Sequence, residues 1–175
     1  DVRPPPALAT PTGRWLAPAR RGQSLHAPAT FDLLGERHTL EAVGWNGPGV
    51  SRLWRYHQHY FDDLGAHGAA SRTALHAALI GRWIADNPPG RGAGWEPYPL
   101  SLRVVRWIQW LLAGNAAPPG MVASLAVQAR WLARRLETQR CRRDPCGHEA
   151  ADQRHQDFDE RVAERIAERR SHQRF

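Results

Sequence analysis

Apolar residues recur at intervals of three and four through the middle of the chain, a spacing that places them on one face of an α-helix. The segments with this spacing are residues 53–64, 71–86, 102–112 and 121–137. Proline and glycine separate the later segments, and they end helices because proline lacks the amide donor that a helix needs. No segment shows sustained alternation of apolar and polar residues bounded by hairpin turns. The pattern predicts an all-α chain of antiparallel helix pairs joined by short loops.

Composition divides the chain into three zones. Residues 1–30 hold six of the 14 prolines and little periodicity, which predicts an irregular lead-in. Residues 31–137 carry seven of the eight tryptophans and form the expected helical domain. Residues 138–175 contain 17 charged side chains and neither Trp nor Leu, which predicts a charged tail. The apolar stripe of this tail is one residue wide, which predicts a marginal helix at most. The stripe consists of Phe158, Val162 and Ile166.

The chain carries 24 arginines, no lysine and 17 acidic residues, so its formal net charge is +7. This charge favours an anionic partner, such as an acidic polysaccharide, a nucleic acid or an acidic surface. The arginines are spread through the predicted helices instead of forming one basic stripe, which disfavours nucleic acid. No apolar run is long enough to cross a membrane. The first residues lack the charged-then-apolar layout of a signal peptide, and the sequence leaves the compartment open.

Two clusters combine aromatic rings with polar and charged side chains. They span residues 53–62 and 87–103. Such a combination binds sugars, because rings stack on the C–H faces while polar groups bind hydroxyls and carboxylates. The candidate substrate-binding residues are His59, Tyr60, Trp95, Glu96, Tyr98 and Arg103. Trp95 and Tyr98 stand out among them, because helix periodicity does not explain aromatic residues in a loop rich in glycine and proline.

The same residues also have structural interpretations. The aromatic residues of the helical segments are expected to pack in the core. They are Trp54, Phe61, Trp83, Trp107 and Trp110. Arg103 fits an ordinary surface position on a helix, and Glu96 fits an ion pair with an arginine. His57 and His59 do not fit a metal pair, because helix residues two apart point to nearly opposite sides.

Both clusters resemble the N-terminal domain of the heparinase II/III family of polysaccharide lyases. The resemblance covers roughly residues 31–137. The family's LW-x-YNLHYFD motif corresponds to LWRYHQHYFD, from Leu53 to Asp62. Its NPPGRG-x-GWEPYP-x-SLRI-x-NWI-like stretch corresponds to the segment from Asn87 to Ile108. The second motif is long and specific, and it carries most of the resemblance.

The match has departures at His57 and Gln58 in the first motif, and at Arg106, where the family often has Asn, in the second. The resemblance implies a partial (α/α) toroid. It also implies β-elimination at a glycosidic bond next to a uronic acid. That reaction needs Asn, Arg or His to neutralise the carboxylate, a Tyr or His base, and an acid for the leaving oxygen.

The resemblance stops after Glu137. The family continues with a Gly-Asn-His element that supplies the carboxylate neutraliser, and its catalytic Tyr and His lie further downstream. This chain continues with the charged tail, so no catalytic residue is carried over. A frameshift near codon 138 explains why resemblance and composition change together. The tail's Cys141, Cys146, His148 and His155 lack a recognised zinc-ligand spacing, so neither a metal nor a cofactor is predicted.

The sequence therefore predicts a fragment of a lyase-like protein, inactive as this chain, whose partner is an acidic polysaccharide. A non-catalytic module that binds acidic glycans is one alternative, and a basic nucleic-acid-binding protein is a less favoured one. An incomplete ring of helices also predicts self-association through exposed helix faces. The candidates for those faces are Trp107, Trp110 and Trp131.

Overall fold

The structure is a computed structural model that describes residues 3–7, 9, 12–13, 15–16 and 18–143 of the 175. The chain divides into two compact units, residues 1–135 and 136–175. Of the second unit, only the helical backbone of residues 136–143 is described. The expected tail helix lies outside the described residues, and so does the Cys/His run apart from the backbone of Cys141.

A small antiparallel sheet precedes the helices. Its strands are β1 (Leu25–His26), β2 (Thr30–Leu33) and β3 (Glu36–Thr39), in that order. β2 is the central strand, and its Phe31 lies opposite Leu25 of β1 and His38 of β3. In β2, buried and partly exposed side chains alternate, so this strand presents one apolar face to the core.

This sheet makes the expected all-α class wrong, and the partial (α/α) toroid has no support in the described residues. The strands were missed because they are two to four residues long. In β2, only Phe31 and Leu33 point into the core, too few to show a period of two. The hairpin turn is Leu34-Gly35, with both residues at positive φ. Asn or Asp before the glycine is the usual signal for such a turn, and leucine gives none.

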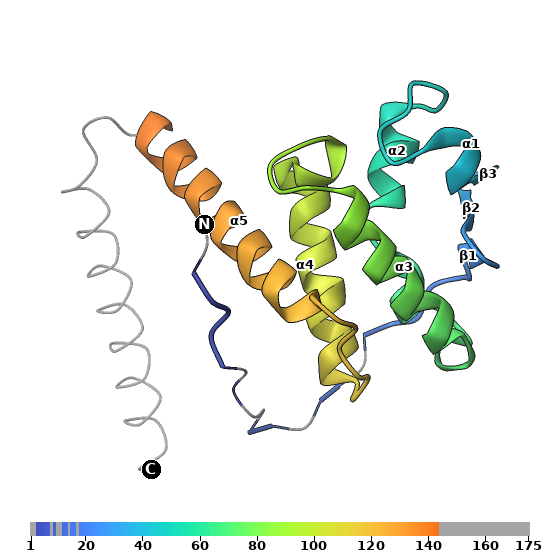
Figure 1. The fold of residues 1–175 in the computed structure, drawn as a ribbon, viewed down its shortest axis with the longest axis horizontal. Helices are drawn as coiled ribbons and strands as arrows, with labels where there is room; N and C mark the ends of the chain where they lie inside the picture. The colour runs from blue at the N-terminus through green and yellow to red at the C-terminus, as the bar shows by residue number, and fades with distance from the viewer. Residues whose placement is uncertain (1–2, 8, 10–11, 14, 17, 144–175) are drawn as a thin grey trace, which may run out of the picture. The chain divides into compact units, whose positions relative to one another are not determined.

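The helices of the described chain follow the sheet. They are α1 (Leu40–Val43), α2 (Arg52–Gln58), α3 (Thr73–Asp86), α4 (Pro97–Leu112) and α5 (Met121–Arg143). Short 3₁₀ turns lie between them, namely η1 (Asp62–Gly65), η2 (Ala69–Arg72) and η3 (Ala93–Trp95). Figure 1 shows α3, α4 and α5 side by side. Trp83 of α3 packs edge-on against Trp107 of α4, with ring centroids 5.7 Å apart.

The periodicity located the later three helices correctly but not all of their ends. α4 begins at Pro97, five residues before the predicted start. Proline suits the first turn of a helix because the amide there needs no intrahelical partner. The first predicted helix, residues 53–64, is instead the shorter α2 followed by η1. Phe61 interrupts it by adopting a left-handed conformation with φ of 60°.

Tryptophan rings form the centre of the core. The predicted packing role of the helical aromatic residues is confirmed, because all five are buried. Phe61 packs edge-on against both Trp83 and Trp107, with ring centroids 6.5 and 5.6 Å apart. Such edge-to-face pairs stabilise a core beyond the burial of their area.

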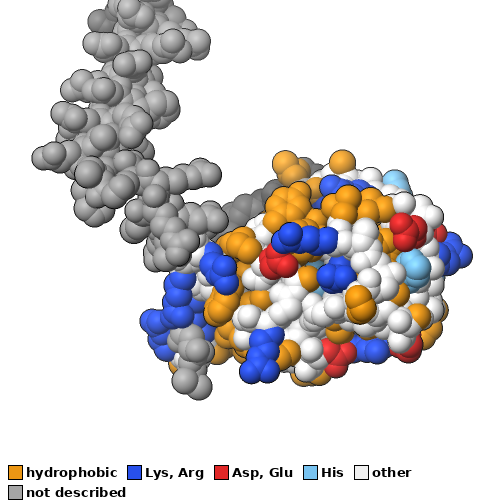
Figure 2. All heavy atoms as spheres, turned by 90° about the horizontal axis from the view of Figure 1, so that it is seen from above, with side chains coloured by type: hydrophobic (Ala, Val, Ile, Leu, Met, Phe, Trp, Pro, Cys, Tyr) orange, Lys and Arg blue, Asp and Glu red, His pale blue; other side chains and the backbone are white. Residues whose placement is uncertain are grey.

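The exposed apolar surface differs from the expected one. Trp107 and Trp110 are buried, and Trp131 packs against the core, so they do not form the predicted faces for self-association. The exposed large apolar side chains of α4 are Tyr98, Val105 and Ile108. Figure 2 shows apolar side chains beside arginines on one face of the molecule. None of the described helices is long and apolar enough to span a bilayer.

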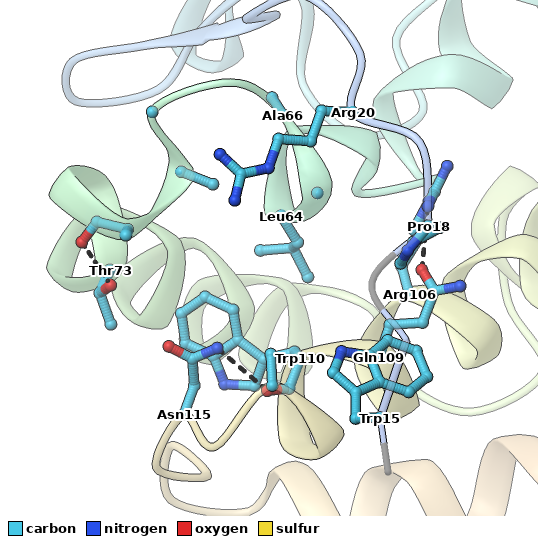
Figure 3. Close-up of a pocket in the computed structure, with 15 residues that line it drawn as sticks. Trp15, Pro18, Arg20, Leu64, Ala66, Thr73, Arg106, Gln109, Trp110 and Asn115 are labelled. Carbon is cyan, nitrogen blue, oxygen red and sulfur yellow. Dashed lines mark hydrogen bonds between the residues drawn. The ribbon is translucent and has the colours of Figure 1, made fainter.

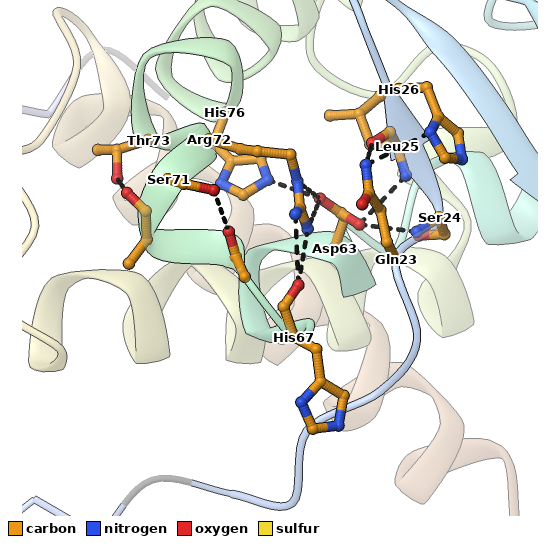
Figure 4. A network of polar contacts seen from close by, with 12 residues as sticks. Gln23, Ser24, Leu25, His26, Asp63, His67, Ser71, Arg72, Thr73 and His76 are labelled. Atoms are coloured by element: carbon orange, nitrogen blue, oxygen red, sulfur yellow. Dashed lines mark hydrogen bonds and ion pairs between the residues drawn. The ribbon is translucent and has the colours of Figure 1, made fainter.

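Asp63 of η1 joins the sheet to the helices (Figure 4). Its Oδ1 accepts from the backbone N–H groups of Ser24 and Leu25, at 2.7 and 3.1 Å. Its Oδ2 accepts from Arg72 at 2.9 Å and from His76 at 2.7 Å. Burial on its own would raise the pKa of Asp63, but these hydrogen bonds outweigh it and lower the pKa to about 2. The carboxylate therefore stays charged and links β1 to η2 and α3.

Candidate functional site

The two motif segments meet in the interior at His59, the residue after α2. Trp83 Nε1 donates to His59 Nδ1 at 3.0 Å, and an indole nitrogen can only donate. His59 Nε2 must then carry the proton, and it donates to the Trp45 carbonyl at 3.0 Å. Burial lowers the pKa of His59 to about 3, and nearby arginines add to this effect. His59 is therefore a neutral, fully paired residue of the core.

Arg103 of α4 connects the same two segments and is fully buried, with 0% of its surface exposed. Its guanidinium donates to the Gly94 carbonyl at 2.8 Å and to the His59 carbonyl at 3.5 Å. It also donates to Gln128 Oε1 of α5 at 2.9 Å. Its Cζ lies 3.8 Å from the centroid of the Trp83 ring, a cation–π contact. The interpretation of Arg103 as an ordinary surface residue is wrong.

No carboxylate of the described residues pairs with Arg103, so its partners are carbonyls, an amide and a ring. Burial lowers the pKa of Arg103 well below its ordinary value. Close approach also explains the glycine at position 94. A Cβ there would lie 2.6 Å from His59 Nδ1, far inside van der Waals contact. The glycine-rich second motif is thus shaped by packing around His59 and Arg103.

Trp95 and Tyr60 also belong to the interior. Trp95 is 3% exposed, donates from Nε1 to the Asn87 carbonyl at 3.2 Å, and packs between Trp83 and Trp131. Tyr60 is buried, and burial raises its pKa to about 12. Both side chains therefore hold the loop and α2 in position and offer a ligand almost no surface.

Glu96 and Tyr98 are the candidate residues that reach the surface. With Arg52 and Tyr56 of α2 they form what we call the surface cluster. Glu96 Oε2 accepts from Arg52 at 2.6 Å and from the Tyr56 hydroxyl. The expected ion pair of Glu96 with an arginine is confirmed. Tyr98 is 62% exposed, and its ring meets the edge of Tyr60 with centroids 5.8 Å apart.

Electrostatics keep Glu96 ionised in the surface cluster. Partial burial raises the pKa of Glu96, but the hydrogen bonds from Tyr56 and Arg52 outweigh burial and lower it overall. Burial and the neighbouring carboxylate raise the pKa of Tyr56, so its hydroxyl remains a donor at neutral pH. Sequence reasoning did not select Arg52 or Tyr56. Their spacing of four residues on a helix was the available signal, because it places both side chains on one face.

Metal ligands are not gathered in the described part of the chain. No group of three or more His, Cys, Asp or Glu residues there lies close enough together to hold an ion. His57 packs on the Tyr60 ring, with centroids 4.6 Å apart, while His59 is bonded to Trp45 and Trp83. The described site therefore offers hydrogen bonds, one ion pair and exposed aromatic surface.

Comparisons with family models, curated proteins and solved structures find no match to this chain. The resemblance to the heparinase II/III family accordingly rests on the two motifs alone.

Proposed function

We propose that this chain is the N-terminal part of a heparinase II/III-like polysaccharide lyase and that it binds acidic polysaccharide. The observation that supports this best is the shared packing of the two motifs. Arg103 contacts the carbonyls of His59 and Gly94, one from each motif, and Tyr56 of the first donates to Glu96 of the second. The two motif segments that carry the resemblance therefore pack against each other. This is expected if both motifs belong to one domain.

The surface cluster supplies the contact to the polysaccharide in this proposal. The exposed ring of Tyr98 offers a face on which the C–H side of a sugar can stack. The side chain of Arg52 is 72% exposed, and its Nη1 makes no hydrogen bond to the described residues. That nitrogen is available to a sugar carboxylate.

Retention on an immobilised polymer of uronic acid tests the binding. We expect Tyr98→Ala to weaken retention about three- to tenfold, because a stacked ring is lost while the charge is unchanged. Ile108→Ala, which trims another exposed apolar side chain of α4, is the matched control and should bind as the wild type does. Equal retention of both variants contradicts the role of the surface cluster. Trp95→Ala is unsuited to this test because Trp95 is buried.

The lyase part of the proposal predicts no complete reaction from this chain. β-Elimination needs a neutralised carboxylate, a base at C5 and an acid at the leaving oxygen, and no such set is carried over from the resemblance. The chain incubated with a uronic acid polymer should form no unsaturated ends, measured by their ultraviolet absorbance. A chain extended with the reading frame corrected after codon 137 should form them. Absence of product from the extended chain on every uronate polymer would refute the lyase assignment.

A further inference from the structure

A second region, away from the surface cluster, contains a pocket of about 320 Å³. It lies between the N-terminal segment, the η1–η2 turns and the second half of α4 with the loop after it. Its volume is at the lower end of the range of roughly 300–1,000 Å³ that is usual for small-molecule sites. A pocket of this size suits one sugar ring with part of its neighbour.

The pocket combines aromatic and polar walls. Figure 3 shows Arg20 on one side and Trp15 and Trp110 on the other, with Leu64 between them. Trp15 is 36% exposed, so its ring is accessible to a ligand. Asn115 donates from Nδ2 to the Trp110 carbonyl at 3.0 Å, which leaves its Oδ1 as an acceptor for a hydroxyl group.

Arg20 is the available cation of this pocket. No carboxylate of the described residues pairs with it. Arg106, also in the wall, is already paired with Asp62 at 2.8 Å, and Arg21 shares that carboxylate at 2.7 Å. Two arginines therefore share the Asp62 carboxylate, while Arg20 has no carboxylate partner among the described residues, which leaves an excess of positive charge beside the pocket.

The backbone holds Arg20 at this place. Arg21 forms a parallel bridge with Ala66, and the N–H of His67 donates to the Arg21 carbonyl at 2.9 Å. These contacts tie the end of the N-terminal segment to the turn between η1 and η2. With the backbone beside Arg20 held in this way, only its side-chain torsions must be ordered when the planar guanidinium binds a carboxylate through two parallel hydrogen bonds.

We propose that this pocket binds a sugar ring that carries a carboxylate group. Arg20 pairs with the carboxylate, the Trp15 ring stacks on the C–H face of the sugar, and Asn115 accepts from a hydroxyl. This inference rests on the proposed binding of acidic polysaccharide and adds a defined subsite to it. Of the arginines that line the pocket in the described part of the chain, Arg20 is the one without a carboxylate partner, so its charge can pair with the carboxylate while the Trp15 ring stacks on the sugar ring.

Binding of a galacturonate trimer to the whole chain, measured by calorimetry, tests the proposal. We expect Arg20→Gln and Trp15→Ala each to weaken binding about tenfold, with unchanged thermal unfolding, because both side chains are exposed. Arg37→Gln removes the same charge from the sheet, where Arg37 pairs with Asp32, and should leave binding unchanged. The α-1,4-linked galactose trimer, which is the neutral analogue, should bind far more weakly than the acidic trimer.

The outcomes separate this inference from the proposed function. The proposed role of the pocket is overturned if Arg20→Gln and Arg37→Gln weaken binding equally. It is also overturned if the two trimers bind equally well. If the wild type is retained on the polymer in a Tyr98-dependent way but does not bind the trimer, the pocket fails while the proposed function stands. If the chain is not retained on the polymer and does not bind the trimer, both fail.

Discussion

Two regions of the molecule differ in how readily the sequence reveals them and in what their residues do. One is the buried contact between the two motif segments, which we call the motif interior, and the other is the pocket. His59, Trp95 and Arg103 stand in long, specific motifs, yet they are buried and hold α2, the glycine-rich loop and α4 together. Trp15 and Arg20 come from a proline-rich segment without a motif, yet they are exposed around a cavity. The buried motif residues thus specify the fold, whereas the pocket draws its accessible side chains from sequence without a motif; Tyr98 is a motif residue that stays exposed.

Matched tryptophan substitutions give the largest expected contrast between the two regions. Trp95→Ala should lower the free energy of unfolding by about 3–5 kcal/mol, because it empties a packed site between two other tryptophans. Trp15→Ala should change it by about 0.5 kcal/mol or less, since the ring is at the surface. Urea unfolding measures both. Similar losses for the two variants would remove the distinction between interior and pocket.

Asp63 joins the sheet to η2 and α3. Asp63→Asn should lower the free energy of unfolding by about 2–3 kcal/mol, because charge-assisted hydrogen bonds from Arg72 and His76 are lost. Asp32→Asn, which removes an exposed ion pair with Arg37, should cost less than about 1 kcal/mol. Equal effects of the two substitutions in urea unfolding would show that the Asp63 network adds nothing.

The same carboxylate predicts a pH dependence of stability. The pKa of Asp63 is about 2 in the folded chain and 3.8 for the unperturbed group. Because the folded value is the lower one, its contribution is fully present above about pH 4 and is lost as the pH falls towards 2. Unfolding measured across this window should show a weaker acid dependence for Asp63→Asn than for the wild type. An identical dependence for both would contradict the assignment.

Glycine substitutions test whether packing explains the glycine-rich second motif. Their expected effect on the free energy of unfolding is smaller. Gly94→Ala should lower the free energy of unfolding by about 1–3 kcal/mol, because the new Cβ would lie 2.6 Å from His59 Nδ1. Gly81→Ala in α3 meets no atom within 4 Å and should stabilise the chain by up to about 1 kcal/mol. Thermal unfolding compares the two. A neutral Gly94→Ala variant would mean that packing does not explain this glycine.

The sequence predicted the later helices because their apolar positions repeat over several turns. It did not predict the sheet, since β2 buries only Phe31 and Leu33. Burial of Arg103 was detectable in principle, because Leu100, Trp107 and Arg103 share one face at helical spacing. Trp95 was misplaced because a glycine-rich loop suggests exposure, while its glycines here permit close packing. The pocket could not be predicted, because its walls come from three distant segments.

Hydrogen exchange of the whole chain with and without a uronic acid polymer tests the central claim most directly. The account predicts that the polymer slows exchange around residues 15–20 and around Tyr98, while the buried motif residues exchange as before. A neutral polymer should slow exchange nowhere. Protection spread over arginine-rich segments in general, or confined to the buried motif residues, would contradict the claim that the exposed side chains of these two places bind the polysaccharide.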